Sequence, residues 1–479
     1  MGIAKNFIYN VIYQVLLLIL PLITIPYISR VLGSAGIGIN AFTNSIVQYF
    51  ILFGTLGISL YGNREIAYVR DDKIKLCKTF WEITLLKFST STIAYLCFLF
   101  FLIFADEYYL IYWIQSILII SAALEISWFF MGLEDFQKTV LVNLVVKIIG
   151  IILIFTLVNS PDDLWLYVLI MVGSQLLGSL VLWLYIPRYI TRVKLKELNI
   201  KKHLAPSISL FIPQIAVQVY LVLNKTMLGF LSTPDEVGFF DSADKIVRVI
   251  LAVVTSLGTV MLPRISNTFA NGDFHLVKNY VEKSFDFTSY LAIPLMFGLA
   301  AIATEFAPWF FGQDFYRTGL ILVIISPVII FIAWSNVIGS QYLMPTNKIK
   351  IYTRSVVTGA VVNFILNLLL IKQLHSVGTA IATVIAELTV TAVQLYYVRH
   401  EFNIKRLFYS SWKCWVSGFL MFIVVKLIGL LFTNGWLTLS MQVMTGGLSY
   451  FIILFLLKSK MNKTIFESSL GFLKLKRNR

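Results

Sequence analysis

The feature that most constrains this chain is the side on which its charges fall. Its apolar stretches can be read as fourteen membrane-spanning helices, because a helix needs roughly 20 apolar residues to cross about 30 Å of hydrocarbon. Threading the chain from a cytosolic N-terminus places about 30 of its 39 Lys and Arg on one side, in both tails and the even-numbered loops. The opposite loops hold Arg30, Arg317 and Lys372. Since basic residues in short loops stay cytosolic, the bias predicts that both termini face the cytosol.

The connections between the predicted spans are short and leave no room for a soluble domain of ordinary size. The spans are 7–29, 38–62, 80–104, 109–131, 140–158, 164–187, 207–231, 238–262, 285–306, 320–343, 355–372, 377–398, 415–433 and 437–457. The chain is 58% hydrophobic and 13% charged, with a mean hydropathy of +0.83. We therefore predict an all-α, multi-pass protein of the cell membrane whose first span is retained rather than cleaved.

Composition and missing motifs exclude several function classes. The net charge of +15 is explained by cytosolic loops that face anionic headgroups, so nucleic-acid binding is not expected. Three scattered cysteines predict neither a disulfide framework nor a metal site, and the four histidines lack ligand spacing. The chain has no phosphate-binding P-loop motif and no external loop above about a dozen residues. An enzyme is therefore not expected, and neither is a cofactor.

The two halves of the chain look related. The segment AGIGINAFTNSI at 35–46 matches DEVGFFDSADKI at 235–246 with an offset of 200, which superposes Gly38 on Gly238. Six spans separate the copies, so both start on the same membrane face, as in parallel transporter repeats. We predict two six-helix lobes, 1–203 and 204–398, followed by a helix pair and basic cytosolic tail, 399–479.

Six basic residues lie inside the predicted spans, where a charge is unfavourable and usually faces a cavity or a partner. They are Lys87, Lys147, Lys225, Lys245, Arg248 and Lys426. Lys147 is near the middle of its span, too deep to reach the interface, so we expect it in a cavity. Lys225 and Arg30 lie near the outer ends of their spans and could instead extend to the headgroups. Lys426 has no carboxylate nearby in sequence and receives no role.

The eighth span carries four charges on one helical face. Asp241, Asp244, Lys245 and Arg248 follow an i, i+3, i+4, i+7 spacing, which predicts the pairs Asp241–Lys245 and Asp244–Arg248. The four residues form either two self-contained ion pairs near the headgroups or a wall of a water-filled cavity. Bases outnumber acids inside the two lobes, even counting Glu125. Such a cavity would attract an anion, and Lys and Arg suit phosphate oxygens.

Amide side chains are also frequent within the spans. They are Asn40, Asn44, Gln48, Gln175, Gln214, Gln218, Asn224, Asn336, Gln341, Asn363 and Asn367. They could line a path for sugar hydroxyls, or they could hydrogen-bond between helices. The second role is favoured for most of them taken singly.

Two segments resemble a known family. The residues at 27–33 (YISRVLG), 36–38 (GIG) and 40–44, and those at 225–229 (KTMLG) before Val237 and Gly238, are similar to bacterial polysaccharide flippases. These are the exporters of O-antigen, capsule and teichoic-acid repeat units within the multidrug/oligosaccharidyl-lipid/polysaccharide superfamily. Span number and length agree with the family along the whole chain, but the specific motifs cover only these two regions.

The resemblance implies two lobes in a V around a cationic central cavity, and a substrate of undecaprenyl diphosphate that bears an oligosaccharide. The diphosphate would bind basic residues, the glycan would occupy the cavity, and the lipid tail would leave through a lateral opening. Other members often carry an acid before the Lys–Thr pair of the seventh span. The residue here is Asn224, which puts an ion-coupling role there in doubt.

These observations give one functional prediction and one rival. We predict a flippase that works by alternating access, with Arg30, Lys147, Lys225, Lys245 and Arg248 contacting the anion. Asp241 and Asp244 would orient these bases or relay a coupling cation. Expected partners are the lipid-linked oligosaccharide, membrane lipids, a polysaccharide polymerase and glycosyltransferases. The rival is a cation-coupled multidrug antiporter of the same fold, which should carry unpaired acids in its cavity.

Overall fold

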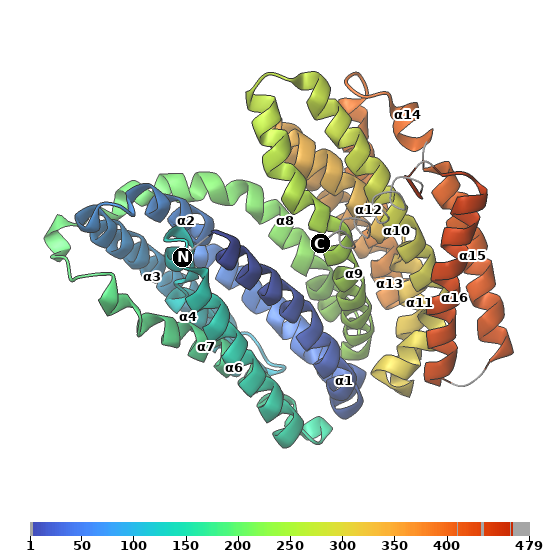
Figure 1. Ribbon diagram of the computed structural model, residues 1–479. Helices are drawn as coiled ribbons and strands as arrows, with labels where there is room; N and C mark the ends of the chain where they lie inside the picture. Colours follow the sequence, from blue (N-terminus) through green and yellow to red (C-terminus); the bar gives the residue numbers. More distant parts are fainter. Residues whose placement is uncertain (1–2, 410, 433–434, 460, 463–479) are drawn as a thin grey trace, which may run out of the picture. The chain divides into compact units, whose positions relative to one another are not determined.

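The computed structural model describes residues 3–409, 411–432, 435–459 and 461–462. Side chains are described from residue 20 onward, except for 210, 212–214, 216, 217, 221 and 259. Within these residues the chain forms helices and no strand (Figure 1). The predicted all-α class is therefore confirmed.

Sixteen α-helices follow one another with short connections. They are α1 Ile3–Thr55, α2 Ile58–Val69, α3 Lys73–Leu102, α4 Tyr109–Leu124, α5 Ser127–Gly132, α6 Phe136–Leu157, α7 Leu164–Trp183, α8 Leu204–Leu231, α9 Pro234–Ala270, α10 Phe274–Phe311, α11 Tyr316–Ile325, α12 Val328–Ser335, α13 Ile349–Val398, α14 Ile404–Tyr409, α15 Trp412–Leu431 and α16 Gly435–Leu456. Short 3-10 turns are η1 Pro161–Asp163, η2 Ile186–Arg188, η3 Leu195–Glu197, η4 Ile200–His203 and η5 Gln313–Phe315, and η6 Asn336–Leu343 is a π-helix.

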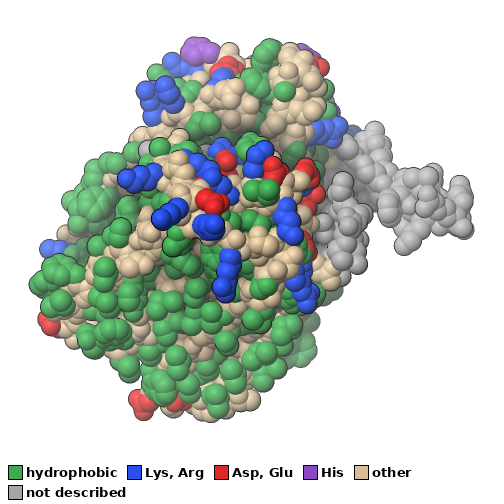
Figure 2. All heavy atoms as spheres, turned by 90° about the vertical axis from the view of Figure 1, so that its left-hand side faces the viewer, with side chains coloured by type: hydrophobic (Ala, Val, Ile, Leu, Met, Phe, Trp, Pro, Cys, Tyr) green, Lys and Arg blue, Asp and Glu red, His purple; other side chains and the backbone are tan. Residues whose placement is uncertain are grey.

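Ten of the described helical segments are long and apolar enough to cross a membrane, or eleven if the bent pair of α11 and α12 with η6 is one span. Two helices are longer than a single crossing needs, because α1 has 53 residues and α13 has 50. Each is broken by one residue with positive φ, Gly33 in α1 and His375 in α13. On the face shown in Figure 2, Lys and Arg gather beside a broad hydrophobic area. The chain is thus a multi-pass membrane protein, while the count of fourteen and the orientation stay predictions.

Two predicted spans are interrupted in ways that hydropathy did not indicate. The fourth, 109–131, is divided into α4 and α5 at Glu125 and Ile126. The tenth, 320–343, bends by 44° between Ile325 and Val328, where Pro327 lacks the N–H that a continuous helix requires. The backbone of α1 leaves helical values at Gly33, which lies in the predicted connection between the first two spans.

The chain divides into two compact units, Met1–Gly238 and Phe239–Arg479. In the first unit α1 packs against α3, α4, α6 and α8, and aromatic side chains fill a core around Phe80, which stacks on Trp128. In the second unit α10 packs against α11, α12, α15 and α16. The lobes 1–203 and 204–398 and the segment 399–479 stay predictions, and residues 463–479 of the basic tail lie outside the described residues.

The first unit contains a very close approach between α1 and the start of α9. A β-carbon added at Gly38 would lie 1.7 Å from the Pro234 carbonyl oxygen, and one added at Gly238 would lie 2.1 Å from the Ser34 carbonyl oxygen. The Ser34 hydroxyl donates a hydrogen bond to the Asp235 carboxylate at the same crossing. Only glycine fits at these two positions, because both distances are far below van der Waals contact.

Candidate functional site

Lys147 lies on the side of α6 that carries its buried residues. Residues along α6 advance by about 100° each, which places Lys147 about 20° from buried Ile154 and about 140° from exposed Ile152. The Lys147 side chain is nevertheless exposed. Among the described residues it has no carboxylate within ion-pair distance. An exposed ammonium on the packed face of a membrane helix requires water or a ligand to solvate it.

Polar side chains occupy neighbouring positions along α6 and α7. Asn143, one turn before Lys147, lies against Gly178, and Ser174 lies against Gly150, one turn after it. The Ser121 and Ser179 hydroxyls lie 3.2 Å apart further along α4 and α7. These groups supply neutral donors and acceptors beside the cation.

Arg30 and Lys225 belong to the same compact unit as Lys147. Arg30 is exposed on α1, one turn after Tyr27, whose hydroxyl donates to the Val158 carbonyl at the end of α6 over 2.8 Å. Lys225 is half-buried on α8, beside Thr226, whose hydroxyl lies 2.8 Å from that of Ser45 on α1. Arg30 therefore stands on α1 itself, and Lys225 stands on α8, which packs against α1.

The four charges on α9 form the two ion pairs that their spacing predicts. Lys245 Nζ lies 2.6 Å from Asp241 Oδ2, and Arg248 Nε lies 2.7 Å from Asp244 Oδ2. Both carboxylates are buried, while the Lys245 and Arg248 side chains are 40% and 45% exposed. The acids thus hold the bases in place, and the basic groups remain accessible. These four residues belong to the second unit, whereas Arg30, Lys147 and Lys225 belong to the first.

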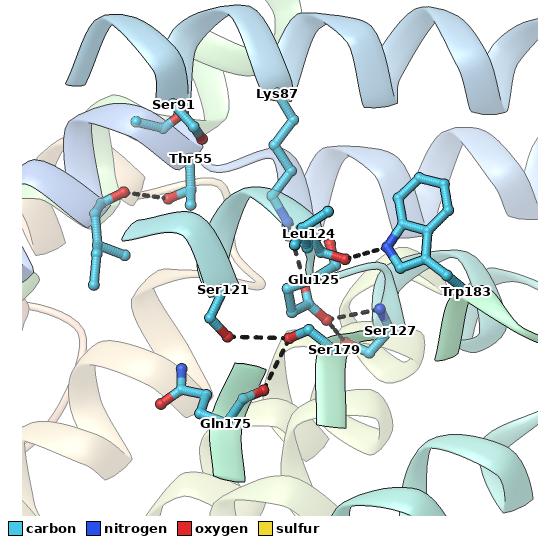
Figure 3. Close-up of polar contacts among 12 residues, drawn as sticks. Thr55, Lys87, Ser91, Ser121, Leu124, Glu125, Ser127, Gln175, Ser179 and Trp183 are labelled. Carbon is cyan, nitrogen blue, oxygen red and sulfur yellow. Dashed lines mark hydrogen bonds and ion pairs between the residues drawn. The ribbon is translucent and has the colours of Figure 1, made fainter. Parts of the chain in front are cut away.

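Lys87 and Glu125, two further charges within the predicted spans, pair with each other and have an internal structural role. Lys87 Nζ donates to the Glu125 carbonyl over 2.5 Å and lies 3.2 Å from its carboxylate (Figure 3). The same carboxylate accepts from Ser127 N over 2.7 Å, and Trp183 Nε1 donates to the Leu124 carbonyl over 2.7 Å. These contacts satisfy the backbone groups left free where α4 ends and α5 begins.

Sequence reasoning missed the role of His203, because the four histidines lack ligand spacing. His203 is 2% exposed, its Nε2 lies 2.9 Å from Glu82 Oε2, and its Nδ1 lies 2.6 Å from the Tyr61 hydroxyl. Lys202 Nζ also reaches Glu82 Oε2 at 2.6 Å. Burial lowers the pKa of His203, although its hydrogen bond to Glu82 acts in the opposite direction. The linker before α8 is thereby fixed to α3, which no sequence spacing indicated.

Lys426, which received no role from the sequence, has a partner from a distant helix. Its Nζ lies 3.5 Å from Glu305 Oε1 and 3.1 Å from the Thr304 hydroxyl. The contact joins α15 to α10 and is partly exposed. Lys426 therefore helps to attach the α15–α16 pair.

Fold and charge pattern together define a polytopic helical transporter rather than an enzyme. Over residues 3–269, more than half of its length, the chain matches the family described as "Polysaccharide biosynthesis protein". The chain belongs to this family.

Individual proteins support the same assignment. The chain is 26% identical over 408 residues to a putative O-antigen transporter of Escherichia coli strain K12, covering 84% of this chain and 98% of the relative. The solved structure of the lipid II flippase MurJ in an inward closed conformation has a TM-score of 0.74 at 18% identity, covering 97% of this chain and 99% of that one. An inward-facing multidrug transporter of the MATE family has a TM-score of 0.58 at 13% identity, covering 80% and 98%. At these identities the two structures establish a shared fold.

Proposed function

We propose that this protein is a flippase that moves undecaprenyl-diphosphate-linked oligosaccharide from the cytosolic to the outer leaflet for synthesis of a surface polysaccharide. The relative in Escherichia coli is named as a putative O-antigen transporter, and the structural neighbour as a lipid II flippase. Both names concern a glycan carried on the cell surface or on a lipid. We further propose that a polysaccharide polymerase and glycosyltransferases act beside this protein.

The observation that carries the proposal is the position of Lys147. A lysine in the middle of a membrane helix is unfavourable unless it faces water or a partner, and Lys147 is exposed on the side of α6 turned away from the lipid-facing residues. Among the described residues no acid neutralises it. Such a cation would attract the diphosphate group, since phosphate oxygens accept strong charge-assisted hydrogen bonds from Lys and Arg.

The remaining predicted residues take related roles in this proposal. Arg30 and Lys225 would contact the anion from the first unit, and Lys245 and Arg248 from the second. Asp241 and Asp244 would orient the last two, because each carboxylate is buried and within 2.7 Å of its base. Transport would proceed by alternating access with no covalent step, and the two predicted lobes would rock against each other.

The rival function, cation-coupled export of lipophilic drugs, rests on the shared fold with the MATE transporter. A drug cation needs an available carboxylate, whereas Asp241 and Asp244 are each paired with a base. The surplus of positive charge therefore favours an anionic substrate.

The experiment that tests the proposal is export of lipid-linked oligosaccharide in cells that carry Lys147→Gln, Lys225→Gln or Arg248→Gln. We expect Lys147→Gln to lower export at least tenfold while the amount of protein in the membrane stays normal. The matched control is Lys426→Gln, which removes a membrane lysine that the structure places at a helix attachment. If all three test variants export normally, the anion site is wrong. Drug efflux by the wild type without any glycolipid export would establish the rival.

A further inference from the structure

We propose that Asn40, Asn44 and Gln48 form an amide ladder along α1 that contacts the glycan of the substrate and thereby contributes to the choice of sugar. This inference rests on the proposed flippase function and adds residues that recognise the neutral part of the substrate. The three residues follow an i, i+4, i+8 spacing, so they lie on one side of the helix. They extend over about 12 Å of its length, which exceeds a single sugar ring.

The ladder lies on a side of α1 that lipid does not reach. All three amides are partly exposed. Between residues 34 and 52, all described, no large hydrophobic side chain is exposed, whereas α6 presents a row of them that includes Leu141, Val145 and Ile152. α1 is also packed against α3, α4, α6, α7 and α8. A polar strip without exposed apolar neighbours is typical of a wall that faces water.

The amides retain much of their hydrogen-bonding capacity. Gln48 Nε2 and Asn44 Oδ1 are 3.5 Å apart, at the limit of a hydrogen bond. In the part of the chain that the structure describes, Asn44 Nδ2 and Gln48 Oε1 have no partner. Gln115 Nε2 donates to Asn40 Oδ1 over 2.9 Å, while Gln115 Oε1 is buried and has no partner among the described residues.

These free groups match the chemistry of a glycan better than that of a diphosphate. An amide offers both donors and acceptors, as hydroxyl groups require, and it carries no charge for a phosphate. Amides left unsatisfied inside a membrane are strongly unfavourable, so a ladder with free groups would persist where water or a ligand satisfies them. Gln115 supports the ladder from α4 by holding the Asn40 side chain.

The test measures binding of two lipids to the purified protein in lipid nanodiscs. The probes are undecaprenyl-diphosphate oligosaccharide extracted from cells that make the polysaccharide, and undecaprenyl diphosphate alone. We expect the double variant Asn44→Leu with Gln48→Met, which keeps side-chain size, to raise the Kd of the oligosaccharide lipid about tenfold. Its Kd for the bare diphosphate should stay within about twofold. Asn44→Ser, which keeps a hydrogen-bonding group, should lose less, and Ile51→Val on the same face is the matched control.

The outcomes separate this inference from the proposed function. Lys147→Gln should weaken both probes, because both carry the diphosphate. If the double variant binds both probes like the wild type while Lys147→Gln loses both, the ladder is refuted and the flippase proposal stands. Equal loss of both probes by a folded double variant would also refute the ladder. Binding of neither probe by the wild-type protein would refute the flippase proposal together with the ladder.

Discussion

Replacing Lys87 by Met should destabilise the first compact unit by about 3 kcal/mol, the lower end of the range for one lost partner of a buried ion pair. The ammonium is 1% exposed and holds two groups of Glu125, its carbonyl at 2.5 Å and its carboxylate at 3.2 Å. Met preserves the length of the side chain but leaves both oxygens without their donor. We choose the lower end because the Glu125 side chain is 30% exposed, so water can compensate in part.

The assay is thermal unfolding of the purified protein in detergent. For a unit of 150–250 residues, about 3 kcal/mol corresponds to roughly 6–12 °C in Tm. The double variant Lys87→Met with Glu125→Gln should recover most of the loss, because no charge then stays unpaired. Lys426→Met is the matched control: its pair with Glu305 is longer, at 3.5 Å, and Lys426 is 34% exposed, so its loss should stay below about 1 kcal/mol.

Two results would contradict this reasoning. If Lys87→Met melts with the wild type, the buried pair does not hold the break between α4 and α5. If the double variant is no more stable than Lys87→Met, the loss comes from packing rather than from an unpaired charge.

Two further predictions concern other parts of the fold. Gly38→Ala should lower the amount of folded protein in the membrane by severalfold, since its β-carbon would lie 1.7 Å from the Pro234 carbonyl oxygen. Quantitative blotting measures this amount. The control is Gly447→Ala, which should be tolerated because no atom lies within 4 Å of the added β-carbon. The pKa of His203 lies below its ordinary value of 6.5 because of burial, so the unfolded state takes up the extra proton as pH falls. The free energy of unfolding should therefore be constant above about pH 6.5 and decline below it. The titratable and charged groups that face His203 are Glu82, Glu65, Tyr61 and Lys202. A Tm that depends on pH as strongly in His203→Gln as in the wild type would contradict this.

Hydropathy was sufficient to predict a helical, multi-pass membrane protein. Apolar length reports how many helices can enter a membrane, but it does not report where a helix stops and restarts. The break at Glu125 depends on Lys87, 38 positions earlier, and on Trp183, 59 positions after Leu124. Such contacts join residues that no local spacing relates.

The charged residues lead to the same conclusion: pairs within one helix can be predicted from sequence spacing, and pairs between helices cannot. The pairs on α9 follow from an i, i+4 spacing and were predicted correctly, since both partners lie on one helix. His203 and Lys426 looked unremarkable because their partners, Glu82 and Glu305, come from other helices. Two lysines precede His203 in a basic linker, and nothing in this local sequence indicated that the histidine is buried.

The crossing of α1 and α9 has a consequence for how positions 38 and 238 vary. Position 38 touches 234, and position 238 touches 34, so the contact is reciprocal with an offset of 200. A two-fold dimer interface has this property, in which one patch is complementary to itself. The chain therefore carries within one polypeptide the equivalent of an isologous contact. A substitution that separates the helices at Gly38 also relieves the crowding at Gly238, so changes at the two glycines should cost less together than the sum of each alone.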